Sequence, residues 1–302
     1  MNVRSYVTAD VFTDRRFGGN PLAVFPDGAG LDGALMQSIA RELNLSETVF
    51  VLPPETSGGT RRLRIFTPAM ELPFAGHPTV GTAVLLAEAG AFGDASEIVF
   101  EEGAGPVPVR LERGSDGRVR ATLTSPRLPA EVPGLPGPED LARVIGLPAS
   151  ALAVRPAPAA WSAGVCFAVI PLRERSALSA ARLDPAAWSA SMAEGPAPHI
   201  YPVWMEDWER GGDVHVRMFA PAMGIPEDPA TGAAAAALVG FLAALRRSAD
   251  GVARWRVLQG MEMGRPSEIA ISAVFAGGRL EAAMVGGGAV TVAKATLELD
   301  PP

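Results

Sequence analysis

Phe66-Thr67-Pro68-Ala69-Met70 is repeated about half the chain later as Phe219-Ala220-Pro221-Ala222-Met223. Each copy is followed by a proline and then by a polar residue in front of a Pro-x-x-Gly turn. The turn reads Gly76-His77-Pro78-Thr79-Val80-Gly81 in the first copy and Glu227-Asp228-Pro229-Ala230-Thr231-Gly232 in the second. Because the order of these elements is preserved, the sequence predicts a duplicated fold.

Each copy of the repeat reads as a strand, a turn and a helix. Residues 62–66 and 213–219 alternate polar with apolar side chains, which is the pattern of a strand with one buried face. The proline of each turn suits the first turn of a helix, where a missing N–H group is no loss. Residues 79–89 and 231–245 are almost entirely small and apolar, so each helix is predicted to be buried on every side.

A helix that is buried on every side keeps free N–H groups in its first turn. Together with the helix dipole, these groups form an anion-binding site. If the two halves face each other, two helix ends look into one cleft with His77 and Asp228 at its mouth. The favoured ligand then carries a carboxylate. The alternative is that both polar residues only cap their helices.

The composition is that of a globular protein. The chain has 302 residues, of which 48% are hydrophobic and 20% charged, enough for two domains with separate cores. The net charge is −7 and no long basic run occurs, which argues against nucleic acid as a partner. The longest apolar run, residues 232–245, is shorter than the roughly 20 residues that cross a bilayer.

The N-terminal residues lead directly into a predicted strand, without the apolar core of a signal peptide. We therefore expect a cytoplasmic protein with no membrane partner. Cys166 is the single cysteine and lies in an apolar run. Its expected role is that of a small core residue rather than a nucleophile, and no disulfide can form within the chain.

The pattern along the chain predicts two domains with matching parts. Residues 1–125 read as strands around one buried helix, and strands near 285–302 are expected to complete this domain. Residues 126–284 form the second domain and repeat the arrangement. A sheet wrapped around a central helix would bury that helix as its composition requires.

Several elements are predicted with definite bounds. A helix is expected at residues 32–43, a single strand at 161–170 and a helical stretch at 183–192. Five prolines within residues 126–138 indicate a linker or crossover between the domains.

Five motifs occur along the chain in a specific order. They are Asp10-Val11-Phe12-Thr13, Phe17-Gly18-Gly19-Asn20-Pro21-Leu22-Ala23-Val24, Asn44-Leu45-Ser46-Glu47-Thr48-Val49-Phe50, Phe74-Ala75-Gly76-His77-Pro78-Thr79 and Glu227-Asp228-Pro229-Ala230-Thr231-Gly232. Their combination resembles the PhzF-like phenazine-biosynthesis family. The resemblance implies the α+β fold of diaminopimelate epimerase: two pseudosymmetric domains, each a mixed β-barrel wrapped around a central apolar helix, with the active site in the cleft between them.

The resemblance also implies an activity, the cofactor-free isomerisation of a dihydro-hydroxyanthranilic acid in which a glutamate moves a proton. Carried onto this sequence, the glutamate is Glu47, and His77 and Asp228 match the assisting polar residues. No cofactor and no metal is implied. The substrate-binding positions that the motifs suggest are Asn20, Ser46, Gly76, Thr231, Gly232 and Ala233.

Two departures from related proteins bear on this expectation. The family motif usually continues with serine where this chain has Ala233, which puts the phenazine substrate in question more than the reaction class. Related epimerases place a cysteine on each side of the cleft, and the matching positions here look like Gly76 and Asp228. Because Cys166 lies outside both motifs, a two-thiol racemase is excluded.

The site residues also have simpler explanations. A buried carboxyl at Glu47 can serve as base and then as acid. The alternative is that Ser46 and Glu47 only satisfy backbone groups in a turn, and Asn20 fits either a substrate contact or a turn.

Other polar or glycine-rich segments fit no site. Gly286-Gly287-Gly288 lacks the context of a dinucleotide fingerprint and is interpreted as a turn between terminal strands. His199 and His215 lie outside the motifs, and their spacing does not predict a metal site.

Three functions therefore compete. The leading hypothesis is a cofactor-independent isomerase that moves a proton on a small carboxylated, cyclic, amino-acid-like substrate. The second is a hydrolase or lyase that uses the same glutamate, and the third is a binding protein that has lost catalysis. A homodimer is the expected assembly for a soluble enzyme.

Overall fold

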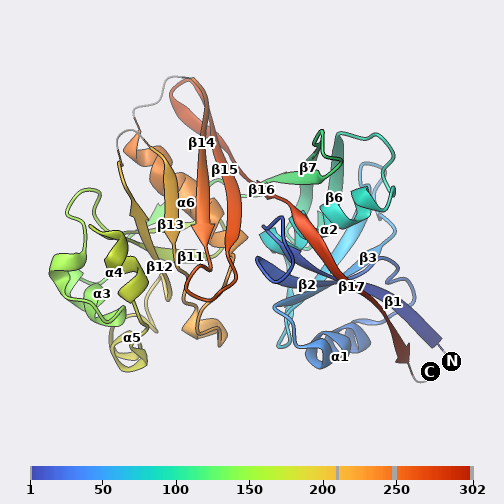
Figure 1. Ribbon diagram of the computed structural model, residues 1–302, viewed down its shortest axis with the longest axis horizontal. Coiled ribbons are helices and arrows are strands. Elements are labelled where there is room, and N and C mark those ends of the chain that lie inside the picture. The colour runs from blue at the N-terminus through green and yellow to red at the C-terminus, as the bar shows by residue number, and fades with distance from the viewer. Residues whose placement is uncertain (1, 209–210, 247–249, 300–302) are drawn as a thin grey trace. The chain divides into compact units, whose positions relative to one another are not determined.

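The computed structural model describes residues 2–208, 211–246 and 250–299 (Figure 1). The protein has a mixed α+β fold whose core is mostly sheet. Its contacts divide it into two compact units: unit 1 comprises Met1–Pro126 and Gly286–Pro302, and unit 2 comprises Arg127–Val285. The last three residues of the predicted 285–302 segment lie outside the described ranges.

Unit 1 is built on strands that pair in the order β17-β1-β2-β3-β4-β6-β7-β8, with β5 added beside β4. The pairs β2/β3 and β4/β6 are parallel and the others are antiparallel. β17 pairs with β1 along its whole length, which ties the C-terminal segment to the N-terminal strand. The bounds are β1 Asn2–Val11, β2 Asn20–Phe25, β3 Glu47–Leu52, β4 Arg61–Phe66, β5 Glu71–Leu72, β6 Glu97–Glu102, β7 Gly105–Arg113, β8 Val119–Thr124 and β17 Ala289–Leu299.

Helix α2 (Gly76–Glu88) lies inside the strands of unit 1 (Figure 1). Every residue from Gly76 to Ala87 is buried, and the helix contacts β1, β2, β3, β7, β8 and β17. A Cβ atom at Gly81 would lie 2.5 Å from the side chain of Val11 and 2.7 Å from that of Leu22. Glycine at this position therefore allows the helix to approach the sheet closely.

Helix α1 (Gly33–Leu43) covers the other side of the same strands. Asp32 caps it by accepting a 2.8 Å hydrogen bond from the backbone N–H of Leu35. Its apolar face packs on the aromatic side chains of β2, β3 and β4. Because helices cover both sides, successive residues of β2 and β3 are buried. This apolar cluster comprises Phe25, Leu31, Met36, Ile39, Ala40, Phe50 and Phe66.

Unit 2 has strands that pair in the order β9-β10-β11-β12-β13-β14-β15. The pairs β11/β12 and β13/β14 are parallel. The bounds are β9 Ala130–Val132, β10 Ala159–Ser162, β11 Cys166–Pro171, β12 His199–Met205, β13 Asp213–Val216, β14 Gly251–Gln259, β15 Ser267–Ala276 and β16 Arg279–Gly287. Its helices are α3 Pro138–Val144, α4 Arg175–Ala180, α5 Pro185–Ser191 and α6 Gly232–Leu245, with 3-10 turns η1 Ala149–Ala151 and η2 Pro221–Met223.

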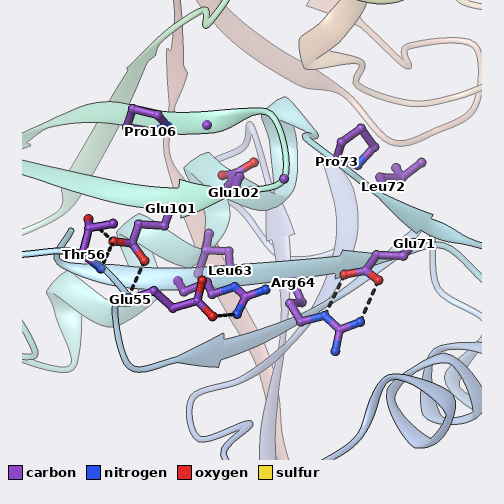
Figure 2. Close-up of a pocket in the computed structure, with 13 residues that line it drawn as sticks. Glu55, Thr56, Leu63, Arg64, Glu71, Leu72, Pro73, Glu101, Glu102 and Pro106 are labelled. Atoms are coloured by element: carbon purple, nitrogen blue, oxygen red, sulfur yellow. Dashed lines mark hydrogen bonds and ion pairs between the residues drawn. The ribbon is translucent and has the colours of Figure 1, made fainter. Parts of the chain in front are cut away.

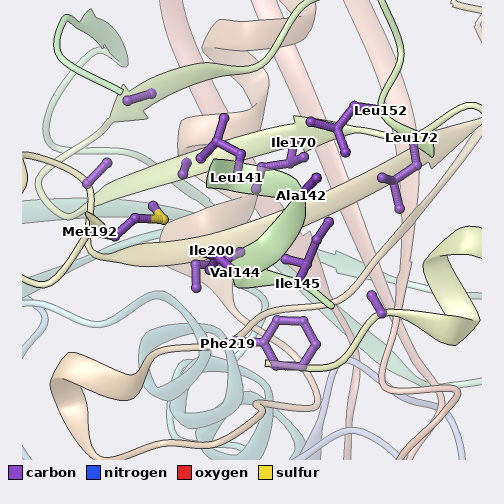
Figure 3. Packing of buried hydrophobic residues seen from close by; sticks show 14 of the residues in the cluster. Leu141, Ala142, Val144, Ile145, Leu152, Ile170, Leu172, Met192, Ile200 and Phe219 are labelled. Carbon is purple, nitrogen blue, oxygen red and sulfur yellow. The ribbon is translucent and has the colours of Figure 1, made fainter. Parts of the chain in front are cut away.

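Helix α6 is the apolar helix of unit 2 and contacts β9, β10, β11 and β15. At Gly240 a Cβ atom would lie 2.5 Å from the ring of Trp161 and 2.7 Å from Pro129. A second layer of apolar side chains fills the space between α3, α5 and the strands β10 to β12. Figure 3 shows Leu141 and Val144 of α3 among Ile170, Ile200 and Phe219 in this cluster.

The structure corrects several predicted elements. The single strand at 161–170 is wrong: it is a hairpin of β10 and β11, because Gly164 has φ +130° and donates to the Ser162 hydroxyl in the turn between them. The helical stretch 183–192 is confined to α5, and α4 precedes it.

The turn predicted at Gly286-Gly287-Gly288 is also wrong. Gly286 and Gly287 belong to β16, so only Gly288 links the two terminal strands. A Cβ atom at Gly286 would lie 2.7 Å from the carbonyl oxygen of Ala121, and this close approach to β8 explains the glycine. Within the described ranges, no helix is long and apolar enough to cross a membrane.

Candidate active site

Glu47 and His77 meet inside unit 1. Glu47 is the first residue of β3, and His77 is the second residue of α2. His77 Nε2 lies 3.2 Å from Glu47 Oε2, and the two side chains are 5% and 15% exposed. The helix and the parallel strand therefore bring an imidazole and a carboxyl group together at the edge of a buried core.

The protonation state of His77 follows from its surroundings. Burial lowers the pKa of His77 to about 3, so the ring is neutral at physiological pH. The ring donates a hydrogen bond to the carbonyl of Pro21, and Nδ1 is the donor because Nε2 faces Glu47. A neutral ring with its hydrogen on Nδ1 presents a lone pair at Nε2. The contact with the carboxyl oxygen is then favourable when one proton lies between the two atoms.

This histidine makes the stability of unit 1 depend on pH. The folded pKa of about 3 lies below the unfolded value of about 6.5, so the unfolded state binds more protons between these values. The contribution is fully present above pH 6.5 and is lost as the pH falls from there toward 3. We expect His77→Gln to flatten the decrease in urea midpoint, followed by far-UV circular dichroism, between pH 6.5 and pH 4.

A matched control is His215→Gln on β13, because His215 is only partly buried and a partly buried ring can still be protonated with water nearby. The urea midpoint of the His215→Gln protein should depend on pH in nearly the same way as that of the unchanged protein. Equal slopes for His77→Gln and the unchanged protein would contradict the assignment of a buried neutral imidazole.

The segment before Asn20 is held in an unusual conformation. Phe17 has φ +69° and its backbone N–H donates a 2.7 Å hydrogen bond to the buried carboxylate of Asp10. Gly19 has φ +59°, and a Cβ atom there would lie 2.2 Å from the carbonyl oxygen of Val11. Asn20, which is buried, is thereby fixed at the start of β2, next to the carbonyl group that binds His77.

Asp228 and Thr231 meet inside unit 2. Asp228 is 7% exposed, its backbone N–H binds the carbonyl of Met218, and its Oδ2 accepts a hydrogen bond from the Thr231 hydroxyl. Thr231 is the N-cap of α6. Gly232 opens the helix and is buried, and Ala233 after it is partly exposed. The first turn of α6 therefore presents backbone N–H groups beside a carboxylate.

Known proteins resemble this chain over nearly its whole length. The sequence profile described as phenazine biosynthesis-like protein matches residues 9–295. The chain belongs to this PhzF family. It is 42% identical to an uncharacterized isomerase of Mesorhizobium japonicum over 98% of this chain and 99% of the relative. It is 38% identical to the trans-2,3-dihydro-3-hydroxyanthranilate isomerase of Pseudomonas aeruginosa over 96% of this chain and 97% of that enzyme.

A solved structure shows the same fold. The crystal structure of the Bacillus anthracis phenazine biosynthesis protein of the PhzF family superposes with a TM-score of 0.89, at 26% identity, over 99% of this chain and all of that one. The mixed α+β fold with its mostly sheet core is therefore that of the PhzF family. The protein is a PhzF-like isomerase.

Sequence reasoning missed Gln259, the residue that holds the Asp228 turn. Gln259 ends β14 and is fully buried. Its Nε2 donates to the Asp228 carbonyl at 2.7 Å and to the Thr231 hydroxyl at 3.0 Å, and its Oε1 accepts from the Thr231 N–H at 3.3 Å. No motif marks this glutamine, because it is distant in sequence and only the pairing of β13 with β14 brings it to the turn.

A second missed feature is an arginine in each copy of the repeat. Arg64 makes a bidentate hydrogen-bonded pair with Glu71, and Arg217 makes one with Glu227. Each guanidinium lies over the phenylalanine of its own repeat copy, at 5.1 Å and 5.0 Å from the ring centroid. The signal was present in the sequence, because both arginines stand two residues before the repeated phenylalanine.

Tyr201 is a buried aromatic side chain of unit 2 on which the charge of Asp228 acts. Tyr201 on β12 is fully buried, and burial, then the charge of Asp228, raises the pKa of its hydroxyl. The ring of His199, two residues earlier on the same strand, lies 5.6 Å from that of Phe167. His199 therefore belongs to a buried aromatic row of unit 2, a place that its position outside the motifs did not indicate.

The remaining candidates carry no separate site. Cys166 is half-buried, and burial raises the pKa of its thiol, which disfavours the reactive thiolate. In the part of the chain that the structure describes, no group of three or more histidine, cysteine, aspartate or glutamate residues is placed to hold a metal ion. Ser46 is partly exposed next to Glu47, and Gly76 is buried at the start of α2.

Proposed function

We propose that this PhzF-like protein is a cofactor-independent isomerase that moves a proton on a small carboxylated, cyclic, amino-acid-like substrate. Glu47 acts as general acid and base, and His77 and Asp228 assist it. The observation that carries the proposal is the 3.2 Å contact between Glu47 Oε2 and the Nε2 of a neutral His77. A carboxyl group that shares one proton with a buried imidazole can donate that proton to carbon.

The proposed reaction removes one proton from the substrate and returns one. As a carboxylate, Glu47 takes a proton from one substrate carbon, and the electron pair moves along the conjugated system. As a carboxylic acid it returns a proton to another carbon, so the substrate changes its bonds and keeps its composition. His77 stabilises the acid stage by accepting the hydrogen of Glu47 at Nε2, since its Nδ1 is committed to Pro21.

The substrate carboxylate is proposed to bind at the free N–H groups of the first turns of α2 and α6. These turns begin at Gly76 and Gly232. Thr231 and Ala233, two other proposed binding residues, are the neighbours of Gly232 in the sequence. The arrangement requires two barrel-around-helix domains, residues 1–125 with 285–302 and residues 126–284, that share one substrate in a cleft. The proposed binding residues are Asn20, Ser46, Gly76, Thr231, Gly232 and Ala233.

The substrate class is supported by the relative from Pseudomonas aeruginosa, whose name specifies trans-2,3-dihydro-3-hydroxyanthranilate. Ala233 separates this chain from the serine expected in the family motif, and it is partly exposed in the first turn of α6. We therefore propose a substrate that does not need a hydroxyl donor at this point. The cytoplasmic location and the homodimer remain predictions of the sequence.

A proton-exchange screen in heavy water tests the proposal. The purified protein is incubated with trans-2,3-dihydro-3-hydroxyanthranilate and with a panel of dihydroaromatic and cyclic amino acids, and products are followed by proton NMR and mass spectrometry. An isomerase places deuterium on a substrate carbon with no other change of mass. Addition of water or loss of a group would show a hydrolase or lyase, and binding without any exchange would show a protein that has lost catalysis.

A further inference from the structure

Glu102 is a buried carboxyl group beside the turn that carries His77. It is the last residue of β6, is 8% exposed, and lines a pocket of unit 1 (Figure 2). The backbone N–H of Ala75 donates to its carboxyl group, and its Oε1 lies 2.6 Å from the hydroxyl of Thr79. Ala75 is the N-cap of α2 and Thr79 is the fourth residue of the helix, so Glu102 binds both ends of the turn.

The Thr79 hydroxyl has two oxygen neighbours, and both contacts are hydrogen bonds at once only if Glu102 is protonated. Thr79 Oγ1 also lies 2.7 Å from the carbonyl oxygen of Ala75, which can only accept. A hydroxyl has one hydrogen, so when it goes to Ala75 the 2.6 Å contact needs a hydrogen from the carboxyl group. Burial acts in the same direction, since it raises the pKa of Glu102 to about 8 and keeps the group protonated at neutral pH.

The other charged groups around this pocket are held by partners of their own. No lining guanidinium is left over to stabilise an ionised Glu102, and on α2 the neighbouring titratable group, His77, is neutral. The lining groups are the pairs Arg62–Glu55 and Arg64–Glu71, and Glu101, which accepts from the backbone N–H groups of Glu55 and Thr56 (Figure 2).

Unit 2 holds its corresponding turn with an amide. Gln259 ends the strand that pairs in parallel with β13, as Glu102 ends the strand that pairs in parallel with β4. Its side chain binds the Asp228 turn from both directions, as donor and as acceptor. An amide keeps these hydrogen bonds at any pH. The same arrangement in unit 1 depends on a proton.

We propose that Glu102 is a positioning residue for His77: its carboxylic acid holds the first turn of α2 in place, and loss of its proton releases that turn. This inference rests on the proposed role of the Glu47–His77 pair. An ionised Glu102 accepts the one hydrogen of the Thr79 hydroxyl. The 2.7 Å contact between Thr79 Oγ1 and the Ala75 carbonyl oxygen is then left without a hydrogen, so these two oxygens repel and the turn shifts. Turnover is therefore lost on the alkaline side through a residue that does not touch the substrate.

The pH dependence of kcat separates this role from a merely structural one. For the unchanged protein we expect kcat to fall about fivefold between pH 8 and pH 9, as for a single ionisation near 8. Glu102→Gln, which copies Gln259, should stay within about twofold of the unchanged protein at pH 7 and lose the alkaline decrease. Glu102→Leu should lower kcat about tenfold or more at every pH, because it can bind neither end of the turn.

The control is Glu101→Gln, the neighbouring residue whose carboxylate lies outside the turn of α2 and which should keep the alkaline decrease. An unchanged alkaline limb in Glu102→Gln would overturn the proposal. So would a folded Glu102→Gln protein that is inactive at pH 7, or a Glu102→Leu protein with unchanged kcat.

A measurement without substrate keeps the inference separate from the proposed function. The folded pKa of Glu102 lies above its unfolded value of about 4.5, so its stabilising proton is fully present below pH 4.5 and lost as the pH rises through 8. The urea midpoint of the unchanged protein should therefore fall relative to that of Glu102→Gln between pH 5 and pH 8. A constant difference would overturn the proposal, even if no substrate were found and the isomerase proposal failed.

Discussion

Glu47→Gln is expected to lower the turnover of the isomerase by roughly 10³-fold or more while the protein remains folded, since acid–base groups contribute roughly 10² to 10⁴ in rate. The amide has nearly the shape of the carboxyl group, and its NH₂ can donate to the lone pair of His77 Nε2, 3.2 Å away in the unchanged protein. The contact between strand and helix is preserved, but the group can no longer give or take a proton.

The measurement is deuterium incorporation into the substrate found by the exchange screen, with the urea midpoint followed by circular dichroism as the test of folding. The matched control is Glu42→Gln on α1, which removes an exposed carboxylate of the same unit and should leave turnover within twofold. Glu47→Gln with full turnover would remove Glu47 from the mechanism and, with it, the proposed isomerisation.

Arg217→Met is expected to destabilise unit 2 by about 3–5 kcal/mol, whereas Arg64→Met should cost unit 1 less than about 1 kcal/mol. The two arginines occupy the same place in the two repeat copies, pair with a glutamate in the same bidentate way and cover the same phenylalanine. Their burial differs: the Arg217 side chain is 3% exposed and that of Arg64 is 23% exposed. Removing Arg217 leaves the partly buried Glu227 carboxylate without its bidentate partner and takes from the Ala181 carbonyl one of its two guanidinium donors.

The tryptophans make this comparison practical, because all five lie in unit 2: Trp161, Trp188, Trp204, Trp208 and Trp255. Tryptophan fluorescence therefore follows the urea unfolding of unit 2, and far-UV circular dichroism follows both units. Adding Glu227→Gln to Arg217→Met should restore part of the loss, because the unpaired, partly buried charge of Glu227 is then removed. Equal effects of the two single substitutions would contradict the role assigned to burial.

Burial of the two apolar helices could be predicted from the sequence, because a helix without a polar face has to be covered on all sides. Residues 79–89 indicated α2 and residues 231–245 indicated α6, although α2 begins at Gly76 and contains His77. The prediction of a single strand at 161–170 is wrong because the hydrophobicity of these residues does not reveal the turn within them. Only the backbone conformation of Gly164 divides that run into a hairpin.

The motif residues of the candidate site were predictable, and the residues that hold them were not. Glu47, His77 and Asp228 lie in short sequence motifs, so they could be identified from the order of residues alone. Glu102 and Gln259 stand at the ends of strands, and only strand pairing brings them to the turns of the two repeats.

The sequence by itself determined the duplication, the two buried helices and the family to which the chain belongs, since these depend on the order and type of neighbouring residues. Only the tertiary structure decided which groups are protonated. Burial lowers the pKa of His77 and raises the pKa of Glu102. Both groups are therefore held neutral, because folding removes them from water. Burial arises only when the chain packs, and it keeps both groups at the first turn of α2 uncharged.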